Sequence, residues 1–135
     1  MNIHFMTCYY ELMYAVTQQQ FEDLVAVAMD ALPKRYQKHL NNVVIVVEDL
    51  PSQEQRQKQK LGPHQTLLGL YEGIPLTSRG NNYSLVLPDK ITLFKTPIEN
   101  MSTNLDELSE QIRHTLWHEV AHYYGLNHHD ISQKE

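Results

Sequence analysis

The segment from Asn104 to Tyr124 constrains the fold most strongly, because it has the period of a helix with two unlike faces. An apolar stripe recurs every four residues, at Leu108, Ile112, Leu116 and Val120. A second stripe lies on roughly the opposite side, at His114, His118 and His122. Asn104 is a suitable N-cap and Gly125 a suitable C-terminal stop. The pattern predicts a helix that packs through its apolar stripe and carries imidazoles on the other side.

The spacing of these histidines predicts a metal site. His118 and His122 are one helical turn apart, so both rings can reach one ion at the roughly 2.0–2.1 Å of a Zn–N bond. Gly125 permits a sharp turn that brings His128 back as a third ligand. Three protein ligands leave one position open for water, which is typical of a catalytic zinc site. We therefore expect one Zn²⁺ per chain.

Glu119 follows the first of these ligands directly. A bound zinc ion lowers the pKa of its water towards about 7 and polarises a carbonyl group. A carboxylate at this position is placed to accept the proton from the water and pass it to a leaving amine. The predicted chemistry is hydrolysis with Glu119 as the catalytic base and without a covalent intermediate.

Other side chains near the motif have alternative interpretations. His129 or Asp130 can replace His128 as the third ligand, or orient a ligand ring. His114 can pair with His118, but no glutamate or glycine is in register for that pairing, so a supporting or surface role is expected. Tyr123 and Tyr124 are expected to pack, although a tyrosine hydroxyl near the metal is a plausible oxyanion partner.

The remaining chain predicts an α+β fold with a small mixed sheet. A capping box at Thr17–Gln20 begins an amphipathic helix whose apolar positions are Phe21, Leu24, Val25, Ala28 and Leu32. The run Val43–Val47 predicts a strand buried on both faces, and residues 52–60 predict a flexible polar loop. Leu67–Tyr71 predicts another strand, and Tyr83–Leu87 with Ile91–Phe94 predict a hairpin. Residues 17–135 are expected to form one domain, preceded by an extension (1–16) of unknown role.

Composition excludes several classes of function. The chain carries 11 basic and 16 acidic residues with no basic stripe, which argues against nucleic-acid binding. A lone cysteine, Cys8, excludes an intrachain disulfide and fits a reducing compartment. No apolar run reaches the roughly 18 residues of a membrane span, and no signal peptide is recognisable. We expect a cytoplasmic protein without membrane partners, and no oligomeric state is assigned.

The segment HEVAHYYGLNH resembles the zinc signature of the zincin metallopeptidases in its extended form. Together with VVIVVEDLP, LLGLYEGIPLTSRG and LPDKITLFKTPIE in the same order, it resembles the small bacterial family of minimal zincin-like metallopeptidases. The resemblance implies a mixed sheet with the zinc helix packed beneath it. It also implies that His118 and His122 are ligands and Glu119 the base, with His128 as third ligand and Asp130 in reserve.

The resemblance implies a zinc-dependent peptidase acting on peptide or protein substrates. An edge strand of such a fold pairs with extended substrate, and Ile91–Phe94 is the candidate because it precedes the zinc helix. Only seven residues follow His128, so the Met-turn of full metzincins is not expected. Two alternatives are a zinc-binding interaction module without catalysis and a metal hydrolase acting on small amides or esters.

Overall fold

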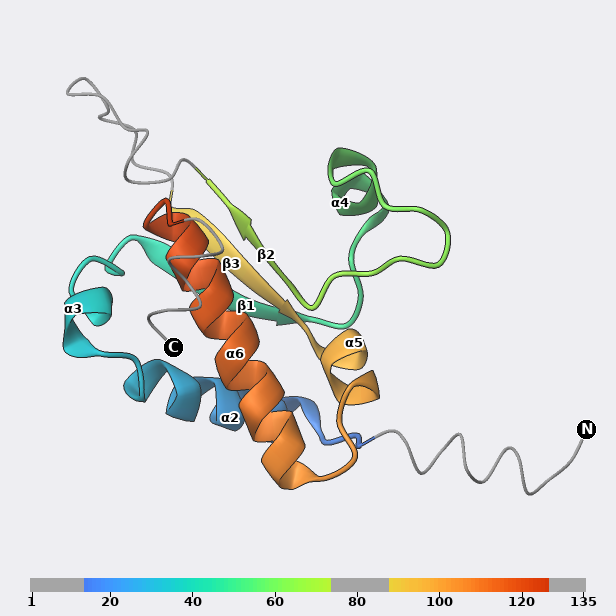
Figure 1. Cartoon of the computed structure of the whole chain (residues 1–135), viewed down its shortest axis with the longest axis horizontal. Coiled ribbons are helices and arrows are strands. Elements are labelled where there is room, and N and C mark those ends of the chain that lie inside the picture. Colours follow the sequence, from blue (N-terminus) through green and yellow to red (C-terminus); the bar gives the residue numbers. More distant parts are fainter. Residues whose placement is uncertain (1–13, 74–87, 127–135) are drawn as a thin grey trace, which may run out of the picture.

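The computed structural model describes residues 14–73 and 88–126, which form helices around a small mixed sheet (Figure 1). In chain order the elements are α2 (Gln18–Asp30), α3 (Lys34–Gln37), β1 (Val43–Glu48), α4 (Gln53–Lys58), β2 (Gly69–Glu72), β3 (Asp89–Phe94), α5 (Lys95–Asn100) and α6 (Leu105–Tyr123). The predicted α+β class is confirmed, with an early amphipathic helix and a late helix that carries the histidine motif. No helix within these ranges is long and apolar enough to cross a bilayer.

Strand β3 lies at the centre of the sheet, between β1 and β2. It runs parallel to β1 and antiparallel to β2, so that Ile45 and Tyr71 both lie opposite Ile91. Every residue of β3 except Lys90 is buried. The prediction that Ile91–Phe94 is the edge strand is wrong, because β3 is paired on both sides. Among the described residues the outer strand beside α6 is β2. Closeness to α6 in sequence therefore did not predict closeness to α6 in the sheet order.

Strand β1 is the other outer strand among the described residues. The prediction that Val43–Val47 is buried on both faces is wrong, since most of its residues are only partly buried and Val44 is 42% exposed. A continuous β-branched run is typical of a central parallel strand, but here the parallel partner β3 occupies the centre.

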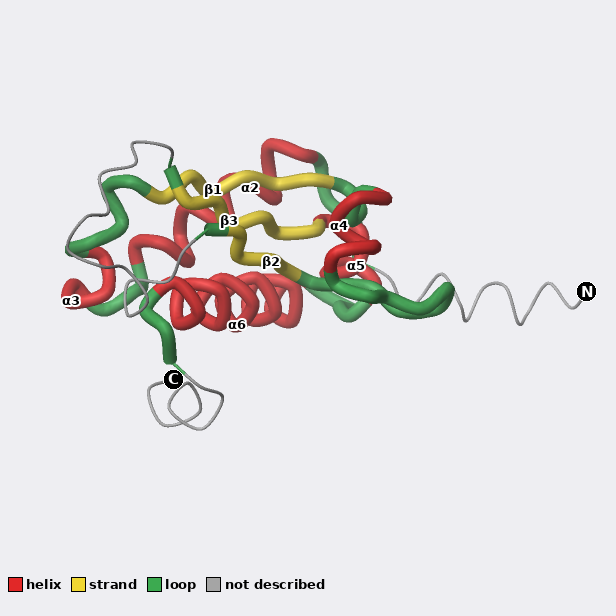
Figure 2. The backbone as a smooth tube through the Cα atoms, turned by 90° about the horizontal axis from the view of Figure 1, so that it is seen from above, coloured by secondary structure: helices red, strands yellow, loops and turns green. Residues whose placement is uncertain are grey.

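One hydrophobic core joins α2, α6 and one face of the sheet. The predicted stripe of α2 is confirmed, with Phe21, Val25 and Ala28 buried and Leu24 partly buried, while Leu32 is buried just after the helix ends at Asp30. From the sheet, Ile91 and Leu93 enter the same core, because alternate residues of a strand face the same side. Figure 2 shows α6 running along one side of the sheet, with α3 near one end of the molecule and α4 and α5 near the other. The core thus holds α6 in a fixed position against β2 and β3.

The predicted flexible loop at residues 52–60 is wrong, because most of it forms α4. Ser52 Oγ accepts from the amide of Gln55 at 3.1 Å, and Gln55 Oε1 accepts from the amide of Ser52 at 2.9 Å. This reciprocal capping box satisfies two amides that a short helix would otherwise expose. Gln55 is buried, and its Nε2 donates to Glu72 Oε1 at 3.1 Å. The polar helix is therefore attached to β2 by a hydrogen bond and not by an apolar face.

The predicted hairpin is tested only in its second half. Tyr83–Leu87 lies outside the described residues, whereas Ile91–Phe94 lies within β3. Asp89 and Lys90, which were expected in the turn, are the first residues of β3. Asp89 is buried, and its Oδ2 accepts a hydrogen bond of 2.7 Å from the hydroxyl of Tyr71. This bond gives the buried carboxylate a partner inside the sheet.

Residues 14–16 attach to α5 through Glu99. The carbonyl of Glu99 accepts from the amide of Tyr14 at 3.4 Å, and Oε2 accepts from the amide of Val16 at 2.8 Å. The same Oε2 pairs with Lys95 Nζ at 2.9 Å, and both side chains are largely buried. The start of the described chain is thus tied to a buried ion pair. Residues 1–13 of the predicted extension lie outside the described part.

Candidate metal centre

Helix α6 begins and ends where the sequence predicts. Asn104 has extended backbone, and its Oδ1 accepts from the amide of Glu107 at 2.9 Å. Asp106 and Glu107 add negative charge to the first turn, which favours helix formation through the helix dipole. The cap and the dipole therefore fix where α6 begins.

The two predicted stripes of α6 lie in different surroundings. The apolar stripe is fully or almost fully buried, with exposed fractions of 0% for Leu108, Ile112 and Leu116 and 2% for Val120. His114 is exposed, whereas His118 and His122 are partly buried. The apolar stripe thus faces the core, whereas the histidine stripe lies closer to the surface.

His118, Glu119 and His122 are the group in which three metal-binding side chains come together within the described ranges. One ligand-type atom from each lies within 4.8 Å of the others. The ring centroids of His118 and His122 are 4.6 Å apart. Two imidazoles with Zn–N bonds of about 2.0–2.1 Å have centroids roughly 4.5–6.4 Å apart for bond angles from about 90° to 180°. The two rings therefore fit a shared zinc ion.

Glu119 is buried and held by two hydrogen-bonding groups. Its Oε1 accepts from the backbone amide of Tyr71 at 3.0 Å and lies 3.1 Å from Nδ1 of His122. These partners offset the cost of burying a carboxylate. Within the described part of the chain, Oε2 makes no hydrogen bond. One carboxylate oxygen is thus fixed while the other is available for chemistry.

The contact with Glu119 also affects the pKa of His122 and the position of the proton on its ring. The hydrogen bond to Glu119 raises the pKa of His122, and burial of the ring opposes this effect in part. When Nδ1–H donates to a carboxylate, the neutral ring keeps the lone pair of Nε2 for a metal. The donor set therefore suits zinc in its chemistry as well as in its spacing.

Gly69 allows β2 to lie unusually close to α6. A Cβ atom at this position would be 2.7 Å from Cγ2 of Thr115 and 3.1 Å from Cγ of Glu119. Any larger residue would push the strand or the glutamate away. The sequence reasoning missed this role and that of the Tyr71 amide, although a glycine inside the run LLGLY is a recognised signal of close backbone approach.

The turn after α6 has the geometry that the sequence predicts. Gly125 has φ 75°, a left-handed conformation that glycine adopts at little cost. Its amide donates to the carbonyl of His122 at 2.9 Å, and the amide of Leu126 donates to the carbonyl of Ala121 at 3.0 Å. This pair of bonds is a Schellman motif. The predicted third ligand His128 and its alternatives, His129 and Asp130, lie outside the described residues.

Two tyrosines attach the end of α6 to the region of α3. The hydroxyl of Tyr123 donates to the carbonyl of His39, and the hydroxyl of Tyr124 donates to the carbonyl of Tyr36, both at 2.7 Å. The rings of Tyr36 and Tyr124 also meet edge to face, with centroids 5.5 Å apart. The expected packing role of Tyr123 and Tyr124 agrees with these contacts, which fix the helix end just before the Gly125 turn.

Known proteins resemble this chain at two levels. Residues 40–135 match the family model described as zincin-like metallopeptidase. Among solved structures, the chain is similar to a conserved hypothetical protein from Thermo thermophilus, with a TM-score of 0.54 and 18% sequence identity. That similarity covers 88% of this chain and 100% of the other, and at this identity it bears on the fold alone. No curated protein matches the chain.

Proposed function

The chain belongs to the zincin-like metallopeptidase family, and from this membership we propose that it is a zinc-dependent peptidase with Glu119 as its catalytic base. The observation that carries the proposal is the grouping of His118, Glu119 and His122 with one carboxylate oxygen fixed and the other available. A histidine pair alone would support metal binding. The held glutamate beside it supports hydrolysis.

The proposed zinc ligands are His118, His122 and, after the Gly125 turn, His128. When bound, zinc would supply a water of lowered pKa and polarise the scissile carbonyl. Support for the first two ligands comes from their ring spacing and from the contact between Nδ1 of His122 and Glu119, which orients the ring. Support for His128 comes from the sequence spacing and from the left-handed turn at Gly125.

Glu119 performs the proton transfers in this proposal. The Tyr71 amide holds Oε1, so Oε2 is the oxygen that accepts the proton from the attacking water. The same oxygen then donates the proton to the leaving amine nitrogen as the peptide bond breaks. Fixing one oxygen restricts rotation of the carboxylate, which reduces the entropy that must be lost at the transition state.

We propose that an extended substrate lies along the outer edge of β2. The amide of Phe94 donates to the carbonyl of Leu68 on the β3 side, at 2.9 Å. Because backbone groups alternate in direction along a strand, the groups of Gly69 and Tyr71 point outward, as the Tyr71–Glu119 hydrogen bond shows. The outward N–H and C=O of Gly69 can bond a peptide main chain next to Glu119. β2 therefore replaces Ile91–Phe94 as the proposed substrate strand.

The test is cleavage of a quenched fluorescent peptide library by the zinc-loaded protein and by Glu119→Gln. We expect the substitution to reduce kcat/KM by roughly 10²- to 10⁴-fold, the usual contribution of a general base, while zinc content stays the same. Glu54→Gln is the matched control, because that side chain is 77% exposed on α4 and should leave the rate unchanged.

The outcomes separate the possible functions. Equal cleavage by the wild-type and Glu119→Gln chains would exclude Glu119 as the base. A zinc-loaded wild type that cleaves neither peptides nor small substrates would identify a zinc-binding module without catalysis. Glu119-dependent turnover of small amides or esters, with no turnover of peptides, would identify a different metal hydrolase.

A further inference from the structure

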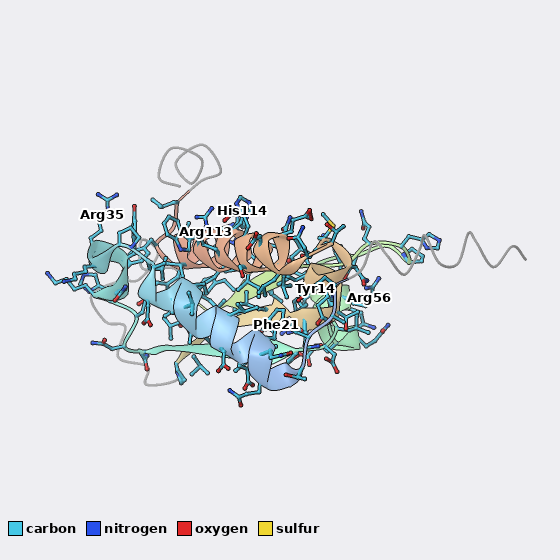
Figure 3. The ribbon with its side chains drawn as sticks, turned by 90° about the horizontal axis from the view of Figure 1, so that it is seen from below. Tyr14, Phe21, Arg35, Arg56, Arg113 and His114 are labelled. Atoms are coloured by element: carbon cyan, nitrogen blue, oxygen red, sulfur yellow. The ribbon has the colours of Figure 1, made fainter. Side chains whose placement is uncertain are left out.

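A third histidine continues the stripe of α6 beyond the proposed catalytic pair. His114 lies one turn before His118 and is exposed, and Figure 3 shows its side chain on the outer side of α6, away from the sheet. The ring centroids of His114 and His118 are 6.5 Å apart, with ring planes tilted by 30°. The proposed function leaves His114 without a role.

The spacing of this outer pair is close to what a shared ion needs. Two imidazoles on one ion have centroids at most roughly 6.4 Å apart when each metal–nitrogen bond is about 2.0–2.1 Å. The observed 6.5 Å is just above that limit. His114 is exposed, and rotation about its side-chain bonds can bring its ring within the distance that a shared ion needs.

The local charge does not oppose a cation at this pair. Arg113 is the nearest basic neighbour in sequence, but its guanidinium pairs with the carboxylate of Glu110 and lies 5.0 Å from the centroid of the Trp117 ring. Glu110 also interacts electrostatically with His114. The positive charge of Arg113 is thus compensated by Glu110 beside the outer pair.

We propose that His114 and His118 form a second divalent-metal site, called the outer register of the histidine stripe. An ion bound there takes the place of an ion bound by His118 and His122, the pair called the inner register. A neutral imidazole offers one lone pair, so His118 serves one ion at a time and the two registers exclude each other. Two imidazoles and water suit Cu²⁺, Ni²⁺ and Zn²⁺, with affinity in the order of the Irving–Williams series. The outer register has fewer ligands and binds more weakly than the proposed zinc site.

The outer register also differs in what it can do. An ion held by His114 and His118 lies about four residues, roughly 6 Å along the helix, from an ion held by His118 and His122. Glu119 accepts a hydrogen bond from the amide of Tyr71 and contacts His122, so it lies beside the inner register. An ion in the outer register is therefore bound but hydrolytically silent. This last consequence rests on the proposed function, whereas binding to the pair does not.

The experiment uses Ni²⁺ and the full chain carrying His122→Ala, which disables the inner register. Calorimetric titration should show one Ni²⁺ bound in this variant. Adding His114→Ala should weaken that binding by at least roughly tenfold, since loss of a group that only supports a metal ligand already costs about 10- to 100-fold. The matched control adds His64→Ala, an exposed histidine between α4 and β2, and should leave Ni²⁺ affinity unchanged.

Because His114 and His64 are both exposed, adding either substitution should leave the thermal unfolding curve of the His122→Ala chain unchanged. Equal Ni²⁺ affinity with and without His114 would overturn the outer register, as would an equal loss in the His64→Ala control. The readout is binding and not cleavage. A chain that hydrolyses no peptide, and so fails the proposed function, can still confirm or exclude this site.

Discussion

The backbone amide of Tyr71 donates a 3.0 Å hydrogen bond to Oε1 of Glu119 and so joins the outer strand of the sheet to the helix that carries the metal motif. The two residues are 48 positions apart in the chain. The donor is a backbone N–H, which every residue except proline would keep at position 71, so the arrangement depends on how closely β2 approaches α6. That approach is controlled by Gly69.

Gly69→Ala should disturb Glu119 directly. The new Cβ would meet Thr115 at 2.7 Å and Glu119 at 3.1 Å, so the strand or the carboxylate has to shift. Overpacking of this kind costs about 1–3 kcal/mol, which chemical denaturation should detect as a lower free energy of unfolding. Gly62→Ala is the control, because its Cβ would meet only Gln65, at 3.4 Å or more. Equal stability of the two variants would contradict the close approach.

Adding Thr115→Ser to Gly69→Ala should restore part of the lost stability. The substitution removes Cγ2, which is the atom nearest to the added Cβ. The two effects should be non-additive, because the residues are in contact. A double-mutant cycle of unfolding free energies checks this expectation, and strictly additive values would show that Thr115 is not the limiting neighbour.

Thr115→Val should stabilise the protein. The hydroxyl of Thr115 is buried and has no hydrogen-bond partner in the described structure, so its desolvation is not offset. Valine keeps the branched shape, and the expected gain is about 1–3 kcal/mol in the free energy of unfolding. Thr103→Val should have the opposite sign, because the hydroxyl of Thr103 donates to Glu107 at 2.8 Å. Destabilisation by Thr115→Val would point to a partner for the hydroxyl.

His122→Ala should remove most of the tightly bound zinc. Elemental analysis after dialysis should find about one zinc per wild-type chain, and the variant should bind zinc more than roughly 100-fold more weakly. The exposed His64 provides the control, and His64→Ala should keep its zinc. Full zinc retention by His122→Ala would exclude the proposed ligand set.

The pH dependence of the metal-free protein should report the Glu119–His122 contact. Because the contact raises the pKa of His122 above 6.5, the protonated ring stabilises the folded state fully below pH 6.5. This contribution is lost as pH rises through the raised folded-state pKa. NMR titration should show a lower pKa for His122 in Glu119→Gln, and the stability difference between the two proteins should be larger at about pH 6 than at about pH 8. An unchanged pKa would contradict the contact.

Helix-level features were predictable from the sequence because they depend on neighbours in the chain. The N-cap at Asn104, the opposing stripes of α6 and the left-handed turn at Gly125 all follow from local spacing. Ser52 and Gln55 also form a capping box that local spacing could have predicted. The polar composition of residues 52–60 instead led to the prediction of a loop where α4 lies.

Strand order was not predictable, because it depends on contacts between distant segments. Val43–Val47 has the composition of a central strand but lies at the edge of the sheet that the described residues form, while β3 takes the centre by pairing with β1 and β2. The role of the Tyr71 amide was not predictable either, because almost every residue type has a backbone N–H and the sequence does not indicate which one is used. The roles of the histidines and of Glu119 were predictable because they depend on side chains, which the sequence states directly.

The attachment of residues 14–16 to Glu99 sets a limit on how this protein can be shortened. A truncated chain that begins at the N-cap Thr17 lacks the amide donor of Val16, while the pair of Glu99 and Lys95 stays buried. The carboxylate then loses one of its two partners in a site with little access to water. Truncations for crystallisation or fusion should therefore begin before Tyr14, so that the short segment ahead of α2 keeps its place on α5.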